Sequence, residues 1–481
     1  MTHGGGAGEV PSVYGDDDQG HGVVGIAVVA ALAGFLFGYD SAVINGAVDA
    51  ISDRFSITGY PLGLVVASAL LGAALGAVTA GRLADHLGRL SVMKIAAVMF
   101  FISAIGTGLA PSLWLLVTFR VVGGIGVGLA SVIAPAYIAE VSPARIRGRL
   151  ASLQQLAIVV GIFASLLVNY VLQRIAGGAD NDLWFGIAAW RWMFLAMVVP
   201  AVVYGVLSFT IPESPRYLIA NDRIPEARDV LHRLLGSAHL DETIARIQQT
   251  LRLEHKPSMR DLKGPALGLL PIVWIGILLS VFQQFVGINV IFYYSTTLWH
   301  AVGFTENDSF IISTITSVVN ILTTFIAIAL VDRVGRKPLL LIGSAGMTVT
   351  LGTMAVIFAT ASLDAEGNPV LTGAAGPIAL IAANLFVVAF GMSWGPVVWV
   401  LLGELFPNRI RAAALSLAAA AQWLANWAIT VSFPALSDFS LGFAYGLYAA
   451  FALLSYLFVT KWVKETKGME LEDMKAEGLP A

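Results

Sequence analysis

Three amide side chains stand in one uncharged stretch of the sequence, SVFQQFVGINVIFYYS, at residues 280–295. They are Gln283, Gln284 and Asn289. An amide both donates and accepts hydrogen bonds, as an alcohol does, so a group of amides can hold a neutral polyol without a net charge. A packed apolar helix does not need three such groups. The stretch therefore predicts a polar ligand.

These three amides cannot share one face of a straight helix, because each residue turns by about 100°. Gly287 lies between them. Membrane helices that break at glycine expose amides and backbone to a water-filled cavity. We therefore expect a break near Gly287 that lets the amides converge. A second break is expected in GMSWGPVVW, which contains Gly391, Gly395 and Pro396.

Other apolar segments carry groups that suit the same ligand: Gln155, Asn320, Trp399, Gln422 and Trp423. Tryptophan offers an apolar face to the C–H side of a pyranose ring. Taken singly, each amide is explained equally well by a bridge between helices, worth about 0.6 kcal/mol. A lone tryptophan is more often part of an interfacial belt. Their occurrence together on five segments favours a sugar-binding site.

Two charged residues lie inside apolar segments, Asp40 in LFGYDSAV and Arg120 in VTFRVVGG. Ionisable groups within a membrane are costly and by default mark relays or pathways. Burial favours the neutral carboxyl of Asp40, whereas a nearby arginine favours the carboxylate. Asp40 is therefore predicted to bind a proton outside and to release it inside. The alternative is a static ion pair that fixes helix contacts.

The composition predicts a membrane protein. Of 481 residues, 57% are hydrophobic and only 12% are charged, against about 25% charged in soluble domains. The net charge of −3 offers no basic surface for nucleic acid. The chain has no cysteine, which excludes disulfides and thiolate chemistry. The sequence shows neither a metal-ligand cluster nor a nucleophile–base arrangement, so we expect no metal, no cofactor and no enzyme.

Segments of about 20 mostly apolar residues can cross a bilayer. Twelve occur, at 23–46, 62–84, 92–110, 113–137, 150–173, 190–211, 268–297, 309–330, 338–360, 376–402, 412–434 and 441–462. All but four of the 28 lysines and arginines fall on the side of the two chain ends; the four are Arg54, Arg120, Arg174 and Arg191. This bias predicts that both termini are cytoplasmic.

The segments divide the chain into five parts. We predict a disordered cytoplasmic tail at 1–21, a six-helix bundle at 22–211, a cytoplasmic helical linker at 212–267, a second six-helix bundle at 268–463 and a cytoplasmic tail at 464–481. In the linker, Pro225 suits the first turn of a helix and Gly236 its end. The polar first residues lack the basic start and apolar core of a signal peptide.

Two motifs occur twice, in the same order. LADHLGR matches LVDRVGR, and EVSPARIRGR matches ELFPNRIRAA. Parallel repeats about an axis normal to the membrane are a transporter architecture, with the substrate site between the halves. The acids and arginines near the cytoplasmic helix ends are Asp85, Arg89, Glu140, Arg147, Glu213, Arg216, Asp332, Arg336, Glu404 and Arg411. We expect them to form ion pairs and helix caps that hold the outward-facing state. The alternative is that they only enforce topology.

Seven segments in order resemble the sugar porter family of the major facilitator superfamily, in particular its bacterial proton-coupled members. They are FGYDSAVINGA, GRLADHLGR, RVVGGIGVG, PESPR, QQFVGINV, VDRVGRKP and ETKG. One departure is Lys464, where the family usually has proline before Glu-Thr-Lys-Gly. The resemblance implies an all-α membrane protein with 12 transmembrane helices in two six-helix bundles, related by a pseudo-two-fold axis along the membrane normal.

The resemblance also implies roles for individual residues. The sugar-binding positions are matched by Gln155, Gln283, Gln284, Asn289, Asn320, Trp399, Gln422 and Trp423. Phe37, Tyr293 and Gly395 match lining or gating positions, and the apolar Ile162 and Phe292 near the site are as in glucose-handling members. Asp40 and Arg120 match the proton-coupling pair.

The expected function is import of a monosaccharide, glucose first, by proton symport with alternating access. We expect a monomer in a bacterial plasma membrane. Xylose, galactose and inositol remain alternatives, and so does a uniporter, against which Asp40 argues. A non-transporting sugar sensor of this fold tends to carry a long signalling tail, whereas only a short segment follows Lys464.

Overall fold

The computed structural model describes residues 20–142, 147–236, 239–253, 258–407 and 410–467. The predicted tails at 1–21 and 464–481 lie mostly outside these residues. The first half contains α1 (Gly20–Ala42), η1 (Val43–Gly46), α2 (Val48–Phe55), α3 (Gly59–Leu87), α4 (Arg89–Leu109), α5 (Leu113–Val141), α6 (Arg147–Ala176), α7 (Ala189–Leu195) and α8 (Val198–Leu207).

The linker and the second half follow. The linker contains α9 (Pro215–Ala220), α10 (Ile224–Leu235), α11 (Leu240–Leu253) and η2 (Met259–Leu262). The second half contains α12 (Pro271–Phe285), α13 (Ile288–Ala301), α14 (Glu306–Val334), α15 (Arg336–Thr360), β1 (Ser362–Leu363), β2 (Pro369–Val370), α16 (Ala375–Gly391), α17 (Trp394–Leu405), α18 (Arg411–Phe439) and α19 (Leu441–Trp462). The antiparallel β1–β2 pair was not predicted.

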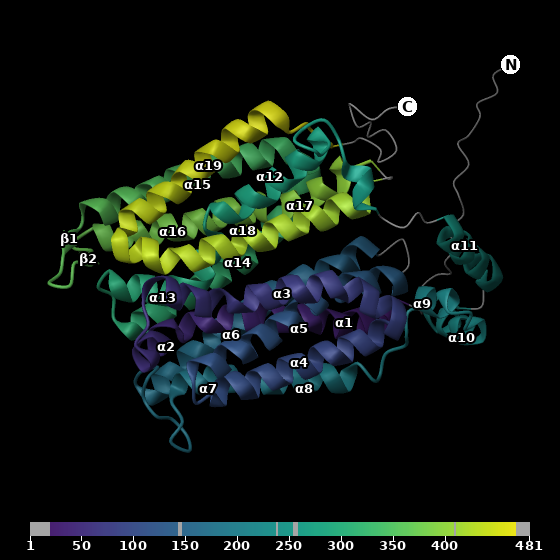
Figure 1. Cartoon of the computed structure of the whole chain (residues 1–481), viewed down its shortest axis with the longest axis horizontal. Helices are drawn as coiled ribbons and strands as arrows, with labels where there is room; N and C mark the ends of the chain where they lie inside the picture. The colour runs from purple at the N-terminus through teal and green to yellow at the C-terminus, as the bar shows by residue number, and fades with distance from the viewer. Residues whose placement is uncertain (1–19, 143–146, 237–238, 254–257, 408–409, 468–481) are drawn as a thin grey trace.

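Twelve helical segments of the described chain are long and apolar enough to cross a membrane, as the sequence predicted. Figure 1 shows α1 to α8 in one group and α12 to α19 in a second group beside it. The linker helices lie at one end of the bundle, and β1–β2 lies at the other. We call the end with the linker the terminal side, and the opposite end the far side.

Both predicted helix breaks are present. Helix α12 ends at Phe285 and α13 begins at Ile288, with Gly287 between them at a φ of 84°. Only glycine adopts this φ readily. Helix α16 ends at Gly391 and α17 begins at Trp394. These two breaks interrupt helices of the second half. They leave backbone N–H and carbonyl groups free to bond with other partners.

A third break lies in the first span and was not predicted. Helix α1 gives way to the 3-10 turn η1 shortly after Asp40. Asn169 of α6 donates a hydrogen bond from Nδ2 to the Val43 carbonyl oxygen at 3.1 Å. A Cβ placed on Gly46 would lie 2.7 Å from the same Nδ2. Buried Asn169 therefore supports the turn that follows Asp40.

Glycine allows the helices of the first half to approach closely. A Cβ on Gly124 of α5 would lie 2.0 Å from the carbonyl oxygen of Ala69 in α3. A Cβ on Gly38 of α1 would lie 2.0 Å from the carbonyl oxygen of Ile158 in α6. Small residues permit such contacts in membrane bundles, where packing replaces the hydrophobic drive for association. They fix α1 and α5, which carry Asp40 and Arg120.

The linker forms a small core of its own, built from Leu218, Ile219, Ala227, Leu231 and Ile244. Helix α10 begins at Ile224 with proline in its first turn and is followed by Gly236 at a φ of 79°, as predicted. The boundaries at residues 211, 267 and 463, which separate the two bundles, the linker and the C-terminal tail, stay a prediction.

Candidate functional site

The amides at the two helix breaks of the second half are joined by hydrogen bonds. Gln283 donates from Nε2 to the carbonyl oxygens of Trp394 and Gly395, both at 3.0 Å. These carbonyls lie at the start of α17, next to the break after α16. Gln422 of α18 donates from Nε2 to Gln283 Oε1. Gln283 thus ties α12 to α17 and α18, through partners 111 to 139 positions further along the sequence.

The same chain of amides continues across the break at Gly287. Asn289 of α13 donates from Nδ2 to Gln284 Oε1. Gln284 donates from Nε2 to Gln283 Oε1 at 3.5 Å. Gln283 and Gln284 are buried, whereas Asn289 is partly exposed. Hydrogen bonds join the four amides, so a polyol can bind by exchanging its hydroxyls for these bonds.

The remaining predicted sugar-binding residues are not joined to this chain. Among the described side chains, no hydrogen bond links Gln155, Asn320 or Trp399 to the four amides. Gln155 and Trp399 are exposed, and Asn320 is partly exposed. A Cβ on Gly391 would lie 3.8 Å from Asn320 Oδ1, which places Asn320 beside the second break. The structure therefore groups Asn320 with the breaks and leaves Gln155 and Trp399 accessible.

The predicted lining residues come from both halves. The ring of Phe37 in α1 lies 6.4 Å from the ring of Trp423 in α18, measured between centroids. Phe292 and Tyr293 of α13 are buried, and Ile162 of α6 is partly buried. The contact between Phe37 and Trp423 joins the helix that carries Asp40 to the helix that carries Gln422.

Asp40 and Arg120 are both buried and form an incomplete pair. Arg120 donates from Nη1 to the Asp40 backbone carbonyl oxygen at 3.0 Å, while Nη1 and Oδ1 are 4.0 Å apart. Asp40 Oδ2 and Arg120 Nε have no hydrogen-bond partner among the described residues. A buried ion pair stabilises a fold only when its geometry is good and its remaining atoms are satisfied. This geometry leaves both charged side chains only partly compensated.

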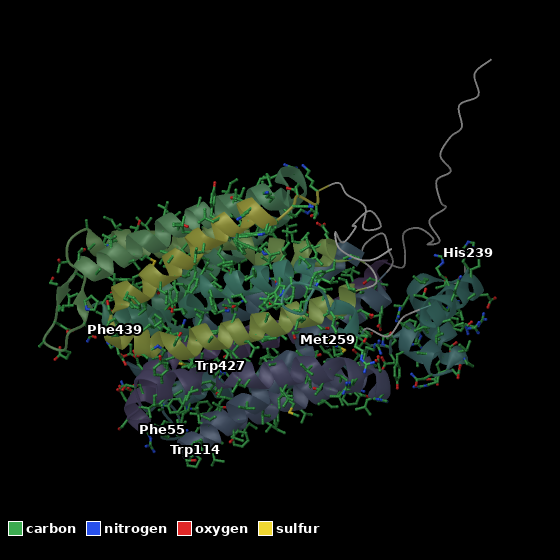
Figure 2. The ribbon with its side chains drawn as sticks, turned by 45° about the horizontal axis from the view of Figure 1, so that its top comes forward. Phe55, Trp114, His239, Met259, Trp427 and Phe439 are labelled. Atoms are coloured by element: carbon green, nitrogen blue, oxygen red, sulfur yellow. The ribbon has the colours of Figure 1, made fainter. Side chains whose placement is uncertain are left out.

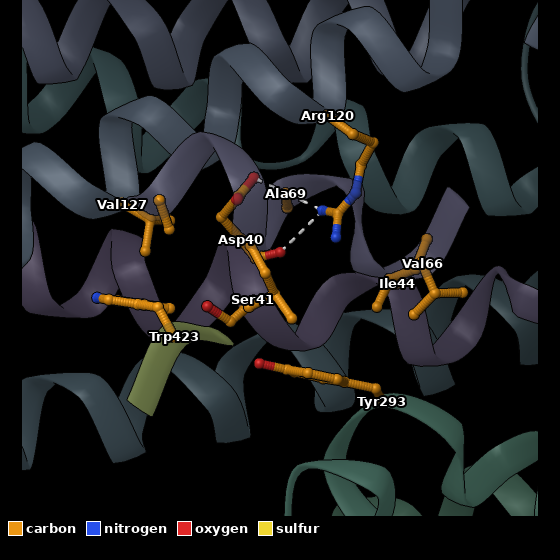
Figure 3. Close-up of a pocket in the computed structure, with 11 residues that line it drawn as sticks. Asp40, Ser41, Ile44, Val66, Ala69, Arg120, Val127, Tyr293 and Trp423 are labelled. Atoms are coloured by element: carbon orange, nitrogen blue, oxygen red, sulfur yellow. Dashed lines mark hydrogen bonds and ion pairs between the residues drawn. The ribbon is translucent and has the colours of Figure 1, made fainter. Parts of the chain in front are cut away.

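A small cavity of about 10 Å³ lies against this pair. Figure 3 shows Asp40 and Arg120 on one side and Tyr293 and Trp423 on the other. About this much space holds one water molecule, provided that polar groups surround it. Trp423, which is a predicted sugar-binding residue, thus lines the same cavity as the charged pair.

An ion-pair network lies at the terminal-side ends of the first half. Arg89 donates from Nη2 to Glu140 Oε1 at 2.8 Å and from Nε to Glu140 Oε2 at 2.9 Å. Asp85 lies 3.5 Å from the same guanidinium. Glu213 accepts from the backbone N–H groups of Arg89 and Leu90 at 3.1 and 3.2 Å. Glu213 thereby satisfies the first turn of α4.

The second half repeats the arginine–glutamate pair and the helix cap of this network. Arg336 donates from Nη2 to Glu404 Oε1 at 2.7 Å and from Nε to Glu404 Oε2 at 3.1 Å. Glu465 accepts from the backbone N–H groups of Arg336 and Lys337 at 3.2 and 3.1 Å. Burial opposes ionisation of Glu465, but these and neighbouring N–H groups outweigh it and lower its pKa.

Glu465 is a network residue that sequence reasoning missed, although the matching pairs Glu213–Ser214 and Glu465–Thr466 were a signal. Ser214 donates to Glu140, and Thr466 donates to Glu404 at 2.5 Å. Of the predicted network, Arg216 lies in α9, and the side chains of Arg147, Asp332 and Arg411 lie outside the described residues. The pairs above lie within one half each, and their role in holding a state stays a prediction.

On the far side, hydrogen bonds join the two halves. Asn45 of η1 donates from Nδ2 to the Phe292 carbonyl oxygen and to Ser295 Oγ, both at 2.9 Å. Asn45 Oδ1 accepts from the Thr296 backbone N–H at 3.0 Å. Asp49 Oδ2 lies 3.3 Å from His300 Nδ1. We call these six residues the far-side lock; only the buried amide of Asn45 in an apolar span could have signalled it.

A second set of far-side contacts lies between the loop after α6 and the start of α14. Glu306 Oε1 accepts from the Ala179 backbone N–H at 2.8 Å. Arg174 donates from Nη1 to Asn307 Oδ1 at 3.4 Å. Partial loss of hydration at nearby Asp180, together with the negative charges of Asp53, Glu306 and Asp49, raises its pKa. The structure thus has the two halves joined on the far side.

Comparisons with known proteins agree along nearly the whole chain. The family described as "Sugar (and other) transporter" matches residues 26–477. A glucose transport protein of Synechocystis sp. is 58% identical over 451 residues, which cover 93% of this chain and 96% of that protein. The D-xylose-proton symporter of Escherichia coli is 38% identical over 487 residues, covering 94% of this chain and 95% of that one.

Solved structures give the same result. The inward-open conformation of the xylose transporter XylE from Escherichia coli matches with a TM-score of 0.79 and 36% identity. The match covers 94% of this chain and 99% of that one. The major facilitator proton:xylose symporter XylE bound to 6-bromo-6-deoxy-D-glucose matches with a TM-score of 0.76, also at 36% identity.

Proposed function

The chain belongs to the sugar (and other) transporter family, a multi-pass membrane family of the major facilitator superfamily, and on this basis we propose that it imports glucose or a similar monosaccharide by proton symport with alternating access. The observation that carries the proposal is the incomplete Asp40–Arg120 pair, buried beside a cavity that is also lined by Trp423, the sequence neighbour of Gln422 in the amide chain.

The amide chain supplies the sugar chemistry. Gln283, Gln284, Asn289 and Gln422 both donate and accept, as sugar hydroxyls do. They are neutral, so they bind without placing a charge in the membrane. Because each amide already has an amide or carbonyl partner, a sugar must replace bonds of similar strength with its own. This exchange favours a ligand with several hydroxyls over one with few.

Asp40 supplies the coupling. Its Oδ2 is buried without a partner among the described residues, a state that suits a protonated carboxyl better than a carboxylate. When alternating access admits water from the other side, the carboxylate becomes more favourable and the proton leaves. One charge that moves through 100 mV releases about 2.3 kcal/mol, which supports about fifty-fold accumulation of sugar per proton.

We also propose how the chain lies in the membrane. The excess of lysine and arginine on the terminal side supports cytoplasmic termini in a bacterial plasma membrane. Figure 2 shows Phe55, Trp114 and Phe439 toward the opposite end from His239 of the linker. Trp114 and Phe439 are 81% and 77% exposed and suit the interface with lipid headgroups. The far-side lock then closes the outer entrance. One chain contains both six-helix bundles, so we propose a functional monomer.

The test is sugar uptake into proteoliposomes with and without an imposed inward proton gradient. It compares the unaltered protein with Asp40→Asn. Asp222→Asn is the matched control, because Asp222 is exposed in the linker with a φ of 58°, which asparagine also tolerates. We expect the gradient to drive accumulation by the unaltered and control proteins, and Asp40→Asn to keep only exchange of labelled for unlabelled sugar. If all three merely equilibrate sugar, the protein is a uniporter.

A further inference from the structure

A tight turn on the far side carries an exposed aromatic residue at its tip. The Ile187 backbone N–H donates to the Trp184 carbonyl oxygen at 3.1 Å. Between them, Phe185 and Gly186 have φ values of 57° and 68°, and two positive φ values are typical of a type I′ turn. The Phe185 side chain is 92% exposed. In Figure 1 the connection that leads into α7 extends sideways from the first half, so the protein leaves this ring uncovered.

A turn of the same kind lies on the terminal side, directly before α12. The Leu269 backbone N–H donates to the Ala266 carbonyl oxygen at 3.0 Å. Between them, Leu267 and Gly268 have φ values of 49° and 89°, and Leu267 is 92% exposed. Asparagine, aspartate or glycine is preferred at the first central position of a type I′ turn, and a bulky residue is strained there. Neither backbone preference nor burial in the protein therefore explains Phe185 and Leu267 at these tips.

A tryptophan of the following helix holds each turn in the same way. Trp192 of α7 donates from Nε1 to the Trp184 carbonyl oxygen at 3.2 Å. Trp274 of α12 donates from Nε1 to the Ala266 carbonyl oxygen at 2.7 Å. In both turns the acceptor directly precedes the exposed residue, and the donor lies eight positions further along the chain. The Trp192 ring also lies 6.4 Å from the Phe185 ring, measured between centroids. Each tip is thus held against the start of the next helix.

Both turns lie where the chain enters the membrane, one on each side. The apolar spans begin at Ala189 on the far side and at Pro271 on the terminal side. In each case the exposed residue precedes the span by four positions. Residues 183–188 and 265–270 contain no lysine, arginine, aspartate or glutamate. Each tip can therefore enter the region of the lipid headgroups, where tryptophan is enriched, without burial of a charge.

From these contacts we propose that Phe185 and Leu267 are lipid anchors, which enter the interfaces of opposite leaflets and fix the depth at which α7 and α12 cross the bilayer. The two turns are not counterparts in the internal repeat, because one precedes the sixth span and the other precedes the seventh. Their partner is therefore something that both faces of the molecule meet, and the boundary between phospholipid headgroups and acyl chains is such a partner. This inference depends neither on the transported solute nor on proton coupling.

The experiment measures the surroundings of each tip with a nitroxide spin label, since the chain has no cysteine of its own. Phe185→Cys and Leu267→Cys are labelled separately in the full-length protein and reconstituted in phosphatidylcholine vesicles. Collision rates of the label are compared for oxygen, which concentrates in lipid, and for a water-soluble nickel chelate. The matched controls are Glu366→Cys in the turn between β1 and β2 on the far side, and Gln249→Cys in α11 of the linker, because both side chains are polar and exposed.

We expect the ratio of oxygen to nickel collisions at each tip to exceed that of its control about tenfold, as for transfer of one apolar side chain out of water. Trp192→Leu, which removes the indole donor, should lower the ratio at position 185 and leave the ratio at 267 unchanged. Trp274→Leu should do the reverse. Each variant is thus the control for the other.

Three results would overturn the proposal. Ratios equal to those of the controls would place both tips in water. Slow collisions with both reagents would mean that a protein surface, such as a second copy of the chain, covers the tips. Entry of one tip alone would refute a role that the two turns share.

Discussion

Removal of the Asn45 carboxamide should open the far side. Asn45 makes three hydrogen bonds across the two halves, to residues 247 to 251 positions away. Each buried hydrogen bond contributes about 1 kcal/mol net. Ser295 keeps its contact with Ser313, so Asn45→Ala should cost the far-side-closed state about 2 kcal/mol rather than 3. This corresponds to a shift of about thirty-fold in the ratio of the two states.

The chain offers a clean assay for this shift, because it has no cysteine. Ser41→Cys introduces a single thiol on the wall of the cavity beside Asp40. In right-side-out vesicles, a membrane-impermeant maleimide should modify this thiol faster by up to about thirty-fold when Asn45→Ala is added. The matched control is Asn307→Ala, which removes one exposed contact with Arg174 at 3.4 Å and should change the rate by less than about threefold.

Two results would refute this reasoning. One is an unchanged labelling rate in an Asn45→Ala protein that still binds sugar. The other is an equal increase in labelling rate for Asn45→Ala and Asn307→Ala, because Asn45 would then contribute no more to far-side closure than an exposed contact does. Either result would mean that helix packing, and not the far-side lock, keeps the halves joined.

Three further predictions concern stability and affinity. Gly287→Ala should lower the free energy of unfolding by about 1–3 kcal/mol, because its φ is 84° and the new Cβ would lie 2.8 Å from the Tyr448 ring; Gly352→Ala, which meets nothing within 4 Å, should leave the melting temperature of the detergent-purified protein nearly unchanged. Glu465→Gln should destabilise the protein above about pH 4.5. Because the pKa of Glu465 is lowered in the folded protein, its contribution to stability is present above the unfolded-state pKa and is lost as the pH falls through the folded-state pKa. The melting temperatures of the two proteins should therefore converge in acid. Melting temperatures that stay apart in acid would contradict this. Gln422→Leu should raise the half-saturating sugar concentration in exchange assays by about tenfold, through loss of one amide of the chain, and an unchanged value would place the sugar elsewhere.

Features that depend on neighbouring residues were predictable from the sequence. The twelve spans follow from runs of apolar residues, and the break at Gly287 follows from a glycine between amides that cannot share a helix face. The end of α10 at Gly236 follows from the same conformational preference of glycine. Burial of Asp40 and Arg120 in apolar spans was also expected, since lone charges there stand out against their surroundings.

The partners of these residues were decided only by the tertiary structure. The sequence singles out Gln283 as a polar group, but only packing brings it to the carbonyls of Trp394 and Gly395 at another helix break. Asn45 appears in the sequence as one amide in an apolar span, and the folded chain makes it the centre of the far-side lock. The physical reason is that hydropathy and helix-breaking preferences act along the chain, whereas each hydrogen bond of the site joins helices that only the packed bundle brings together.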